Sequence, residues 1–410
     1  MSAFKPVAFG LVGVGNFARS YLGSMKQLED EGIGKLKAVV VRNPAKYPER
    51  CDELRSQGVP ILASLEDLLE MKDEVEVVGL PTPIHTHAPM TIQALDAGFN
   101  VLVEKPPAAT VQDVDAMIAA RDRSGKVCAV GFQLITDGGI QKIKQMVCDG
   151  ELGEITDVVA CGKWKRLRSY YDRCPWAGKY MLDGHYVLDG PLNNPLAHIL
   201  NNELYCASAE PGKLATPLSV QAELYKGHDF IESENTSCVR AVLDNGVRLH
   251  FFVTLCAKEY SMQLMVVVGT KGSMLWEFST KLVHRDADGK ETVLPYGKDD
   301  TGRTPNCFRN VAQAVRDPQV PLFTPVQATR NFTLTLNAAF ESGRAAKQIP
   351  PEFIIRQPEG DSEAIYVEDV DTIVDTAFRE RKLYSELGAP WASPTQPFDT
   401  AGYKEFGMKW

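Results

Sequence analysis

The segment Glu104-Lys105-Pro106-Pro107 places a lysine at the end of a predicted buried strand. The carboxyl ends of strands in an open parallel sheet face the ligand crevice, so this position favours contact with a ligand over a solvated surface role. The Lys105 ammonium could donate a hydrogen bond to a hydroxyl or carbonyl oxygen and stabilise negative charge that develops there. We therefore expect Lys105 to be a catalytic residue that also contacts the substrate.

His198 is a second candidate, in the segment Asn194-Pro195-Leu196-Ala197-His198. An imidazole, whose ordinary pKa is about 6.5, can take a proton from a hydroxyl and return it. A lone histidine in an apolar segment can equally be a core residue with satisfied nitrogens, and the residues alone leave both interpretations open. His185, in Asp183-Gly184-His185-Tyr186, competes for the same role and could line the same pocket.

A glycine motif lies near the start of the chain, where Gly13-Val14-Gly15-Asn16-Phe17-Ala18 fits the pattern G-x-G-x-x-[GA]. Gly13 permits a tight turn, Gly15 lets the backbone approach a pyrophosphate, and Ala18 allows close packing of helix on strand. The motif follows a predicted strand and opens a predicted helix, which is the context that a dinucleotide site requires. The alternative is a glycine-rich turn without a ligand.

The residues after the second predicted strand bear on which dinucleotide binds. An Asp or Glu there would accept from the ribose 2′-hydroxyl of NAD, but the chain has Arg42 and Asn43 instead. Arg42 could bind a 2′-phosphate or stack on adenine, which favours NADP over NAD. The alternative is that Arg42 is a solvated loop residue and that Asn43 alone meets the ribose of NAD.

Alternating hydrophobic periods organise the first 131 residues. Short apolar runs alternate with segments of helical spacing, and six such strands predict a parallel sheet covered on both faces. This is the pattern of a doubly wound nucleotide-binding domain. The predicted strands are Ala8–Val12, Leu36–Val41, Val59–Leu62, Val75–Leu80, Val101–Glu104 and Val127–Gly131.

The pattern changes after residue 131. From Ser219 to Leu294 the chain reads as consecutive strands joined by turn sequences such as Asp244-Asn245-Gly246, which predicts a mostly antiparallel sheet. We therefore expect an α/β protein with a Rossmann domain over residues 1–131, a substrate-binding and oligomerisation domain over 132–350, and an extension over 351–410. One amphipathic stretch, Val370–Leu387, interrupts that extension.

A cationic and aromatic segment, KWKRLRSYYDRCPWAGK, runs from Lys163 to Lys179. Aromatic faces suit the C–H faces of sugars, and Arg or Lys suits hydroxyl or carboxylate groups. The alternative is a solvated loop whose aromatic rings pack on the sheet. The substrate-binding candidates in this segment are Tyr170, Tyr171, Arg173 and Trp176.

Taken together, these pieces resemble a known family. The chain resembles the Gfo/Idh/MocA oxidoreductases, the family of glucose–fructose oxidoreductase and inositol dehydrogenase, over roughly residues 6–350. The matching segments are Gly13–Ala18, Pro81-Thr82-Pro83-Ile84-His85-Thr86-His87, Ala94–Gly98, Val101–Pro106, Gly131-Phe132-Gln133, Asp149–Ile155 and Gly269–Ser273.

The resemblance implies a Rossmann domain, a second α/β domain with a large open sheet, and oxidation or reduction of a sugar, glycoside or cyclitol hydroxyl with NAD or NADP. It implies that Lys105 lies near nicotinamide and substrate and that Glu104 belongs to the same segment. It also implies that Pro81, Thr82 and His87 run along the cofactor. Gln133 matches a position close to the nicotinamide, and the open sheet implies a homodimer or homotetramer.

The resemblance further implies that His198 is the acid/base histidine, since its segment matches a D-x-x-x-H-x-x-D pattern. Both flanking carboxylates are asparagine in this chain, at Asn194 and Asn201. Asn194 can still hydrogen-bond the substrate or the imidazole, but its own side chain cannot stabilise an imidazolium by charge. His185 remains the second candidate.

The composition of the chain argues against several classes of function. Lys and Arg total 44 and Asp and Glu 53 in 410 residues, and the formal net charge of −9 argues against a nucleic-acid partner. No apolar run approaches the roughly 18 residues of a membrane helix, and the first residues lack a signal-peptide pattern. Nine cysteines without a CxxC pair predict free thiols in the cytoplasm and no metal site.

Three functions fit these observations. The favoured one is an NAD(P)-dependent oxidoreductase acting on a carbohydrate-like secondary alcohol. The second is a dinucleotide-binding sensor or regulatory protein that keeps the fold without catalysis, which the two asparagines motivate. The third, a reductase of an amino-acid pathway with a similar two-domain plan, fits the Glu-Lys-Pro segment less well.

Overall fold

The computed structural model describes residues 5–410, and the chain divides into two compact units. Unit 1 contains Met1–Ala108, Gln112–Thr136 and Gly302–Arg330. Unit 2 contains Ala109–Val111, Asp137–Thr301 and Asn331–Trp410. The sequence-based boundaries therefore differ from these units in residues 302–330, which belong to unit 1, and in the extension, which is part of unit 2.

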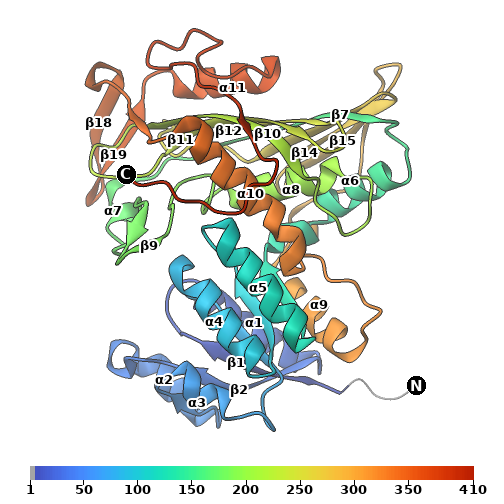
Figure 1. Cartoon of the computed structure of the whole chain (residues 1–410), viewed down its shortest axis with the longest axis vertical. Helices are drawn as coiled ribbons and strands as arrows, with labels where there is room; N and C mark the ends of the chain where they lie inside the picture. Colours follow the sequence, from blue (N-terminus) through green and yellow to red (C-terminus); the bar gives the residue numbers. More distant parts are fainter. Residues whose placement is uncertain (1–4) are drawn as a thin grey trace. The chain divides into compact units, whose positions relative to one another are not determined.

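Unit 1 is built on a six-stranded sheet in the order β3-β2-β1-β4-β5-β6, and every pair is parallel (Figure 1). The order reverses between β1 and β4, which is the topological switch point of a doubly wound sheet. The predicted α/β fold class is confirmed. The strands are β1 (Val7–Val12), β2 (Gly34–Val40), β3 (Ile61–Leu62), β4 (Val77–Leu80), β5 (Asn100–Glu104) and β6 (Cys128–Gly131).

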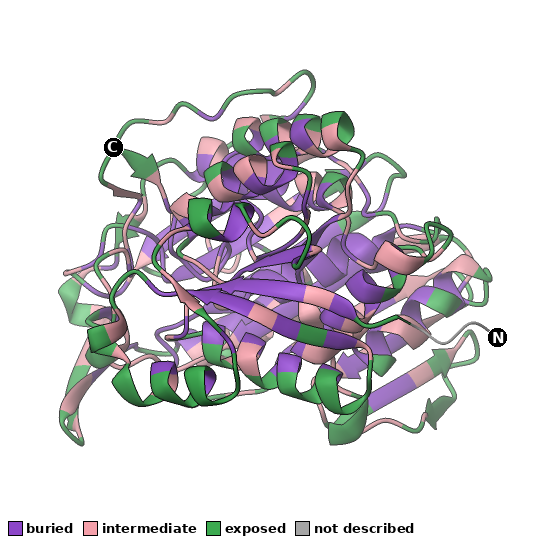
Figure 2. Cartoon of the chain, turned by 90° about the horizontal axis from the view of Figure 1, so that it is seen from below, coloured by how far each residue is buried: buried purple, intermediate pink, exposed green. Residues whose placement is uncertain are grey.

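Burial on both faces explains the near-continuous apolar strands of unit 1. All four residues of β4 are buried, and Figure 2 shows buried residues along strands and exposed residues on the outer sides of helices. The helices are α1 (Ala18–Asp30), α2 (Pro48–Ser56), α3 (Leu65–Leu69), α4 (Ile84–Asp96), α5 (Val111–Ser124) and α9 (Thr304–Arg316), with 3-10 turns η1 (Pro44–Lys46) and η2 (Gln133–Thr136).

Helix α9 joins unit 1 from a distant part of the chain. The ring of its Phe308 meets Phe9 of β1 and Tyr21 of α1 edge-to-face, at 5.5 and 4.8 Å between ring centroids. All three side chains are buried in one apolar cluster with β1, β2 and α1. This packing is the reason that residues 302–330 belong to unit 1.

Unit 2 is built on a ten-stranded sheet whose path is β16-β15-β14-β13-β7-β12-β11-β10-β17, with β20 paired to β10. The pairs β7–β12 and β10–β17 are parallel and the others antiparallel, so the sheet is mostly antiparallel, as predicted. The strands are β7 (Ile155–Lys163), β10 (Pro217–Lys226), β11 (Thr236–Leu243), β12 (Arg248–Thr254), β13 (Leu264–Gly269), β14 (Gly272–Glu277), β15 (Lys281–Asp286), β16 (Glu291–Val293), β17 (Lys347–Gln348) and β20 (Phe398–Asp399).

Smaller elements complete unit 2. Two hairpins, β8–β9 and β18–β19, stand apart from the large sheet, and neither was predicted from the sequence. Their strands are β8 (Met181–Leu182), β9 (His185–Tyr186), β18 (Ile354–Glu359) and β19 (Ser362–Val367). The helices are α6 (Gly138–Cys148), α7 (Arg168–Tyr171), α8 (Ala197–Ala207), α10 (Val326–Gly343, which begins in unit 1) and α11 (Val370–Glu380), with η3 (Lys298–Asp300) and η4 (Pro351–Phe353).

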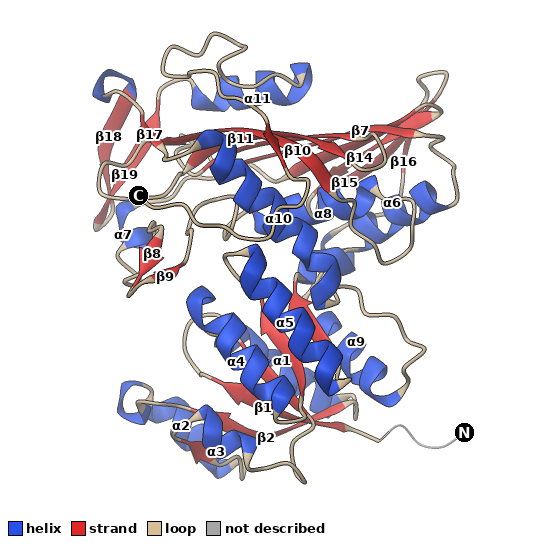
Figure 3. Cartoon of the chain, viewed as in Figure 1, coloured by secondary structure: helices blue, strands red, loops and turns tan. Residues whose placement is uncertain are grey.

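The two faces of the large sheet are covered by different parts of the chain. Figure 3 shows α8 and α6 on one face and α11 on the other. Every residue of α8 is buried. On the other face, Val374, Tyr384 and Trp391 of the extension pack in one cluster with Phe252 of β12 and Tyr225 of β10. The sheet face over β7 and β10–β12 is thus covered within the chain, and the extension forms part of the core of unit 2.

Replacing Tyr384 with Ala should destabilise unit 2. The side chain is buried and its Oη donates to the Ser237 carbonyl oxygen at 3.0 Å, so truncation leaves both a cavity and an unpaired carbonyl. We expect a loss of about 3–5 kcal/mol in the free energy of unfolding, measured by urea denaturation. Lys404→Ala, at an exposed position of the same extension, is the control, and equal midpoints for both variants would contradict this packing role.

Candidate active site and dinucleotide cradle

The glycine motif forms the turn between β1 and α1. Gly13 has φ +107°, a conformation that side chains rarely adopt, and its N–H donates to the Val40 carbonyl oxygen of β2 at 2.9 Å. Asn16 also has a positive φ, of 44°, and Phe17 is 39% exposed. Helix α1 begins at Ala18, so its amino end follows the turn directly, as the dinucleotide pattern requires.

Two residues that the sequence reasoning missed lie over this turn. A Cβ on Gly15 would sit 2.4 Å from the Tyr47 hydroxyl, so any larger residue at this position would require the Tyr47 ring to move. Arg50 of α2 donates from Nη1 to the Val14 carbonyl oxygen. The segment after β2 therefore folds back over the turn. The signal for this in the sequence is the aromatic residue Tyr47, which follows Arg42 and Asn43 closely.

Arg42 and Asn43 follow the end of β2 after one intervening residue, and both are exposed. The carboxylate that would accept from a ribose 2′-hydroxyl is absent at these two positions. Both side chains stand at the strand end where the ribose of a dinucleotide is read in this fold.

Glu104, at the end of β5, is held by a buried hydrogen bond. Tyr21 of α1 donates from Oη to Glu104 Oε2 at 3.0 Å, while Oε1 is buried with no hydrogen-bond partner among the described residues. Burial raises the pKa of Glu104 to about 7, and the neighbouring Lys105 charge opposes this rise. A Cβ on Gly131 would lie 2.7 Å from Glu104 Oε2, so glycine at the end of β6 makes room for the pair.

The loop after β4 is tied to the Lys105 loop by His87. Its Nδ1 lies 2.7 Å from the Pro106 carbonyl oxygen and its Nε2 lies 2.8 Å from the Thr82 carbonyl oxygen. Burial lowers the pKa of His87 to about 4, so the neutral ring donates to one of these carbonyls. His87 therefore joins two loops, Pro81-Thr82 and Lys105-Pro106, and its own ring nitrogens face the backbone.

The residues of unit 1 fit an NAD-type dinucleotide. The turns at Gly13 and Gly15 leave room for close approach to the backbone, and the carboxyl ends of β1, β4 and β5 share one edge of the sheet. Two buried oxygens, Glu104 Oε1 and Gln133 Oε1, have no hydrogen-bond partner among the described residues, so donors from a ligand could satisfy them. Lys105 is half-buried at the same edge.

The proposed acid/base residue belongs to unit 2. His198 is the second residue of α8 and is 9% exposed, and Asn194 lies on the turn that leads into this helix. That turn is closed by bonds from the Asn194 N–H to the Gly190 carbonyl oxygen and from the Leu196 N–H to the Pro191 carbonyl oxygen, at 2.9 and 3.0 Å. Lys105 belongs to unit 1 and His198 to unit 2.

Several side chains of the cationic segment, residues 163–179, form contacts within unit 2. Lys163 and Lys165 form ion pairs at 2.7 Å with Asp375 and Glu359 of the extension. The Arg173 guanidinium lies 3.6 Å above the Tyr170 ring. These two lysines and Arg173 thus fix the segment in place.

The aromatic candidates of this segment differ in exposure. Tyr171 is buried in a small apolar cluster with Ala177 and Ile231, so its ring packs within the protein. Trp176 is half-buried with the Arg173 guanidinium 5.2 Å from its ring, and Tyr170 is half-buried as well. His185 is exposed on the β8–β9 hairpin. Of these side chains, Tyr170, Trp176 and His185 retain surface that a substrate could reach.

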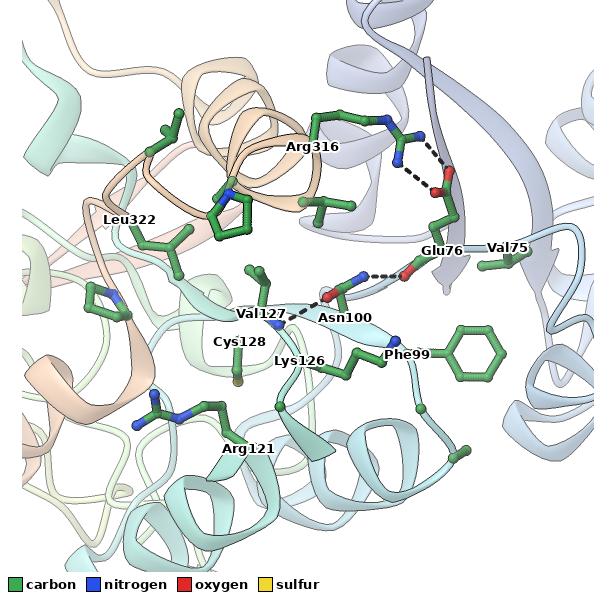
Figure 4. Close-up of a pocket in the computed structure, with 18 of the residues that line it drawn as sticks. Val75, Glu76, Phe99, Asn100, Arg121, Lys126, Val127, Cys128, Arg316 and Leu322 are labelled. Atoms are coloured by element: carbon green, nitrogen blue, oxygen red, sulfur yellow. Dashed lines mark hydrogen bonds and ion pairs between the residues drawn. The ribbon is translucent and has the colours of Figure 1, made fainter. Parts of the chain in front are cut away.

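A cavity of about 630 Å³ in unit 1 lies at the opposite edge of the sheet, at the amino ends of β4, β5 and β6 (Figure 4). Asn100 donates to the Glu76 carbonyl oxygen and accepts from the Val127 N–H, and the Glu76 carboxylate pairs with Arg316 at 2.7 Å. Arg121 and Arg316 lie in the last turns of α5 and α9, where cations offset the helix dipole. We therefore assign this cavity a structural role, because ligands of such sheets bind at the carboxyl edge.

The described part of the chain has no cluster of metal ligands and no membrane-spanning helix. No group of three His, Cys, Asp or Glu side chains in residues 5–410 could hold a metal ion, and the nine cysteines are free thiols. None of the helices in these residues has the length and apolar character needed to cross a bilayer.

The buried Glu104 carboxylate predicts a pH-dependent contribution to stability. Its pKa of about 7 exceeds the ordinary value of 4.5, so between these values the folded chain keeps a proton that the unfolded chain has released. Stability should therefore fall as pH rises through this window, and Glu104→Gln should abolish that part of the fall. Denaturant midpoints across pH test this, with the exposed Glu49→Gln as control, and a variant whose midpoint stays parallel to that of the wild type would contradict it.

Comparison with known proteins adds independent evidence. Residues 7–132 match the model of an oxidoreductase family with an NAD-binding Rossmann fold. A 2,7-anhydro-N-acetylneuraminate hydratase from Mediterraneibacter gnavus is 29% identical over 151 residues, 37% of this chain and 38% of the relative. A glycosyl hydrolase family 109 protein from Shewanella baltica is 29% identical over 156 residues, 36% of this chain and 33% of the relative. The chain thus spans well under half the length of these relatives.

Solved structures match over both units. The WlbA dehydrogenase from Bordetella pertussis, in complex with NADH and UDP-GlcNAcA, has a TM-score of 0.68 at 23% identity and covers 83% of this chain and 97% of its own. Levoglucosan dehydrogenase, in complex with NADH and levoglucosan, has a TM-score of 0.70 at 17% identity, with coverage of 82% and 97%. At these identities the likeness shows the fold. The resemblance seen in the sequence is confirmed: residues 7–132 match the model of the Gfo/Idh/MocA oxidoreductase family, and both units share their fold with dehydrogenases of known structure.

Proposed function

We propose that the chain is an NAD(P)-dependent oxidoreductase that acts on a secondary hydroxyl or ketone of a sugar, glycoside or cyclitol. The observation that carries this proposal is the position of Lys105, at the carboxyl end of β5 and on the same sheet edge as the glycine turn after β1. The sugar-related names of the relatives support the substrate class.

Each proposed residue has one role. The Lys105 ammonium donates to the reacting oxygen and stabilises negative charge on it. His198 takes the hydroxyl proton during oxidation and returns it during reduction, and Asn194 assists from the turn before it. When bound, the dinucleotide supplies hydride transfer at its nicotinamide ring. Tyr170, Trp176, Arg173 and His185 are the proposed substrate contacts of unit 2, whereas Tyr171 supports them from the core.

The dinucleotide is proposed to lie along the carboxyl edge of the unit 1 sheet. Its pyrophosphate would meet the turn of residues 13–18, its ribose would meet Arg42 and Asn43, and its nicotinamide end would meet the segments at Glu104, Lys105 and Gln133. NAD is the dinucleotide that the family description names. Arg42 and the missing carboxylate favour NADP, which we keep as the slightly preferred cofactor.

The quaternary state and location complete the proposal. We propose a homo-oligomer in the cytoplasm with a small-molecule substrate and no nucleic-acid partner. The extension covers the sheet face over β7 and β10–β12, so an oligomer formed through the open sheet would use the strands beyond β7, from β13 to β16.

Two alternatives lead to different outcomes. A sensor without catalysis would bind the dinucleotide but turn over no polyol. The second alternative is a reaction without net oxidation of the substrate. It is suggested by the names of two relatives, a hydratase and a glycosyl hydrolase family protein. Assays should therefore follow sugar products by chromatography as well as the absorbance of the reduced nicotinamide.

Lys105→Met and His198→Ala should each lower kcat by about 100-fold or more, because each removes a group that stabilises charge or moves a proton in the transition state. Dinucleotide affinity, measured by fluorescence titration, should change little for His198→Ala. Lys72→Met, in the cavity at the opposite sheet edge, and His284→Ala, on β15, are the matched controls. Turnover like that of the wild type in both site variants would overturn the mechanism.

Arg42→Ala should weaken NADP binding about tenfold or more and leave NAD binding nearly unchanged, because only NADP offers a 2′-phosphate to the guanidinium. Calorimetric titration with both dinucleotides measures this, and the nucleotide released from denatured protein identifies the bound form. Arg55→Ala, an exposed arginine of α2 paired with Asp52, is the control. Equal losses for both dinucleotides would exclude a role in reading the 2′-phosphate.

A further inference from the structure

The asparagine that precedes His198 is bonded to a buried carboxylate. Asn194 donates from Nδ2 to Asp189 Oδ1 at 2.7 Å. Asp189 is 3% exposed, and its second oxygen accepts from the Gly178 N–H at 2.8 Å. The motif position that would hold a carboxylate is therefore the amide of Asn194. This amide donates a hydrogen bond to the carboxylate of Asp189, five residues upstream.

This contact fixes the orientation of the Asn194 amide. A primary amide has two N–H donors on one side and a carbonyl oxygen on the other, and a carboxylate can only accept from the nitrogen side. With Nδ2 directed to Asp189, the Oδ1 atom is turned away from it and is the group that can accept from a hydroxyl or an imidazole. Asn194 is half-buried, so a ligand can reach it.

The amide of Asn194 lies closer to Asp189 than its cationic neighbour does. The Arg173 guanidinium forms a longer ion pair with the second oxygen of Asp189, at 3.8 Å. Titratable groups that face Asp189 from the packed elements of unit 2 include Arg173, Glu234, Tyr170, Tyr171 and Cys174. Because burial removes most of the water, the negative charge acts on the neighbouring amide with little screening.

A second carboxylate holds the same turn. Burial raises the pKa of Glu234 to about 8, and the Leu192 N–H donates to its carboxyl group. A Cβ on Gly190 would lie 1.9 Å from Glu234 Oε1, so the turn can pass this carboxyl only as glycine. The segment from Asp189 to Asn194 is therefore braced at both ends, which keeps the Asn194 amide in one orientation.

We propose that Asp189 is a positioning residue that orients Asn194 and supplies, through its amide, the negative charge missing from the motif position. The Asn194 oxygen, polarised by Asp189, accepts from the reacting hydroxyl or from the His198 ring and thereby favours the protonated imidazole during oxidation. This inference rests on the proposed function, because it assigns a role in that reaction. Its structural part, the Asp189–Asn194 pair, stands on the contacts above.

Exchanging the two side chains tests this inference in the full chain. Asp189→Asn should lower kcat by about 10- to 100-fold, because a small displacement of the Asn194 amide from its catalytic position is enough for a loss of this size. It should also lower the pKa of His198, because a nearby negative charge is removed. Asn194→Asp alone should lower kcat further, since it sets two carboxylates within hydrogen-bond distance. The double exchange restores one carboxylate and one amide, and it should recover most of kcat and return the pKa of His198 to the wild-type value or above.

The measurements are the kcat–pH profile and the titration of His198 by NMR, with thermal unfolding to verify each fold. Asp183→Asn, an exposed carboxylate on the same segment whose φ of +49° asparagine tolerates, is the matched control. An unchanged His198 pKa and pH profile in Asp189→Asn, or a double exchange no better than the worse single variant, would overturn the inference. A chain that turns over no sugar would instead refute the proposed function, while the His198 titration would still decide whether Asp189 acts on it.

Discussion

A carboxylate that folds away from water must be given donors, and this constraint sets the position of each functional segment. Glu104 receives the Tyr21 hydroxyl, which ties α1 to the strand end that carries Lys105. Asp189 receives the Gly178 N–H and the Asn194 amide, which fixes the turn before His198. Leaving such a group without donors would cost several kcal/mol, so neighbouring elements cannot shift without a large loss of stability.

Asp137 shows the same constraint where no chemistry is proposed. Its carboxylate accepts from the Gly139 and Ile140 N–H groups at the start of α6. It also accepts from the Tyr296 hydroxyl at 2.8 Å and the Trp276 ring nitrogen at 2.9 Å. One buried charge thus joins a helix start to β14 and to the loop after β16. Burial raises the pKa of Asp137, as it raises that of Glu104, so in both cases the donors make up only part of the lost hydration.

The sequence predicted those features whose causes are local. Apolar runs with helical segments between them predict the six strands β1–β6 of a parallel sheet, because a sheet buried on both faces needs this composition. At the start of α3, Ser64 and Asp67 form a capping box with both reciprocal hydrogen bonds present, a local pattern of two residues three apart. Turn sequences at residues 244–246 and 270–272 join antiparallel strands as predicted. The glycine motif follows the same logic, since a positive φ at Gly13 is a property of that residue.

The features that the sequence did not predict depend on contacts between distant residues. Helix α9 belongs to unit 1 because Phe308 packs against Phe9 and Tyr21, some 290 residues earlier, and no local pattern records that pairing. Tyr47 lies over Gly15 only because the chain reverses after β2. Asp189 was overlooked for the same reason, since the motif directs attention to the positions beside His198.

The cationic segment shows how the rest of the fold changes the meaning of a local composition. Read alone, residues 163–179 form a positive patch in an acidic chain. In the folded unit, Lys163 and Lys165 neutralise Asp375 and Glu359 of the extension, so these positive charges hold the extension on the sheet. Arg173, in contrast, stands between the Tyr170 ring and Asp189. The charge of Arg173 is therefore shared with a buried carboxylate and with an aromatic face, so its position is set by the fold of unit 2.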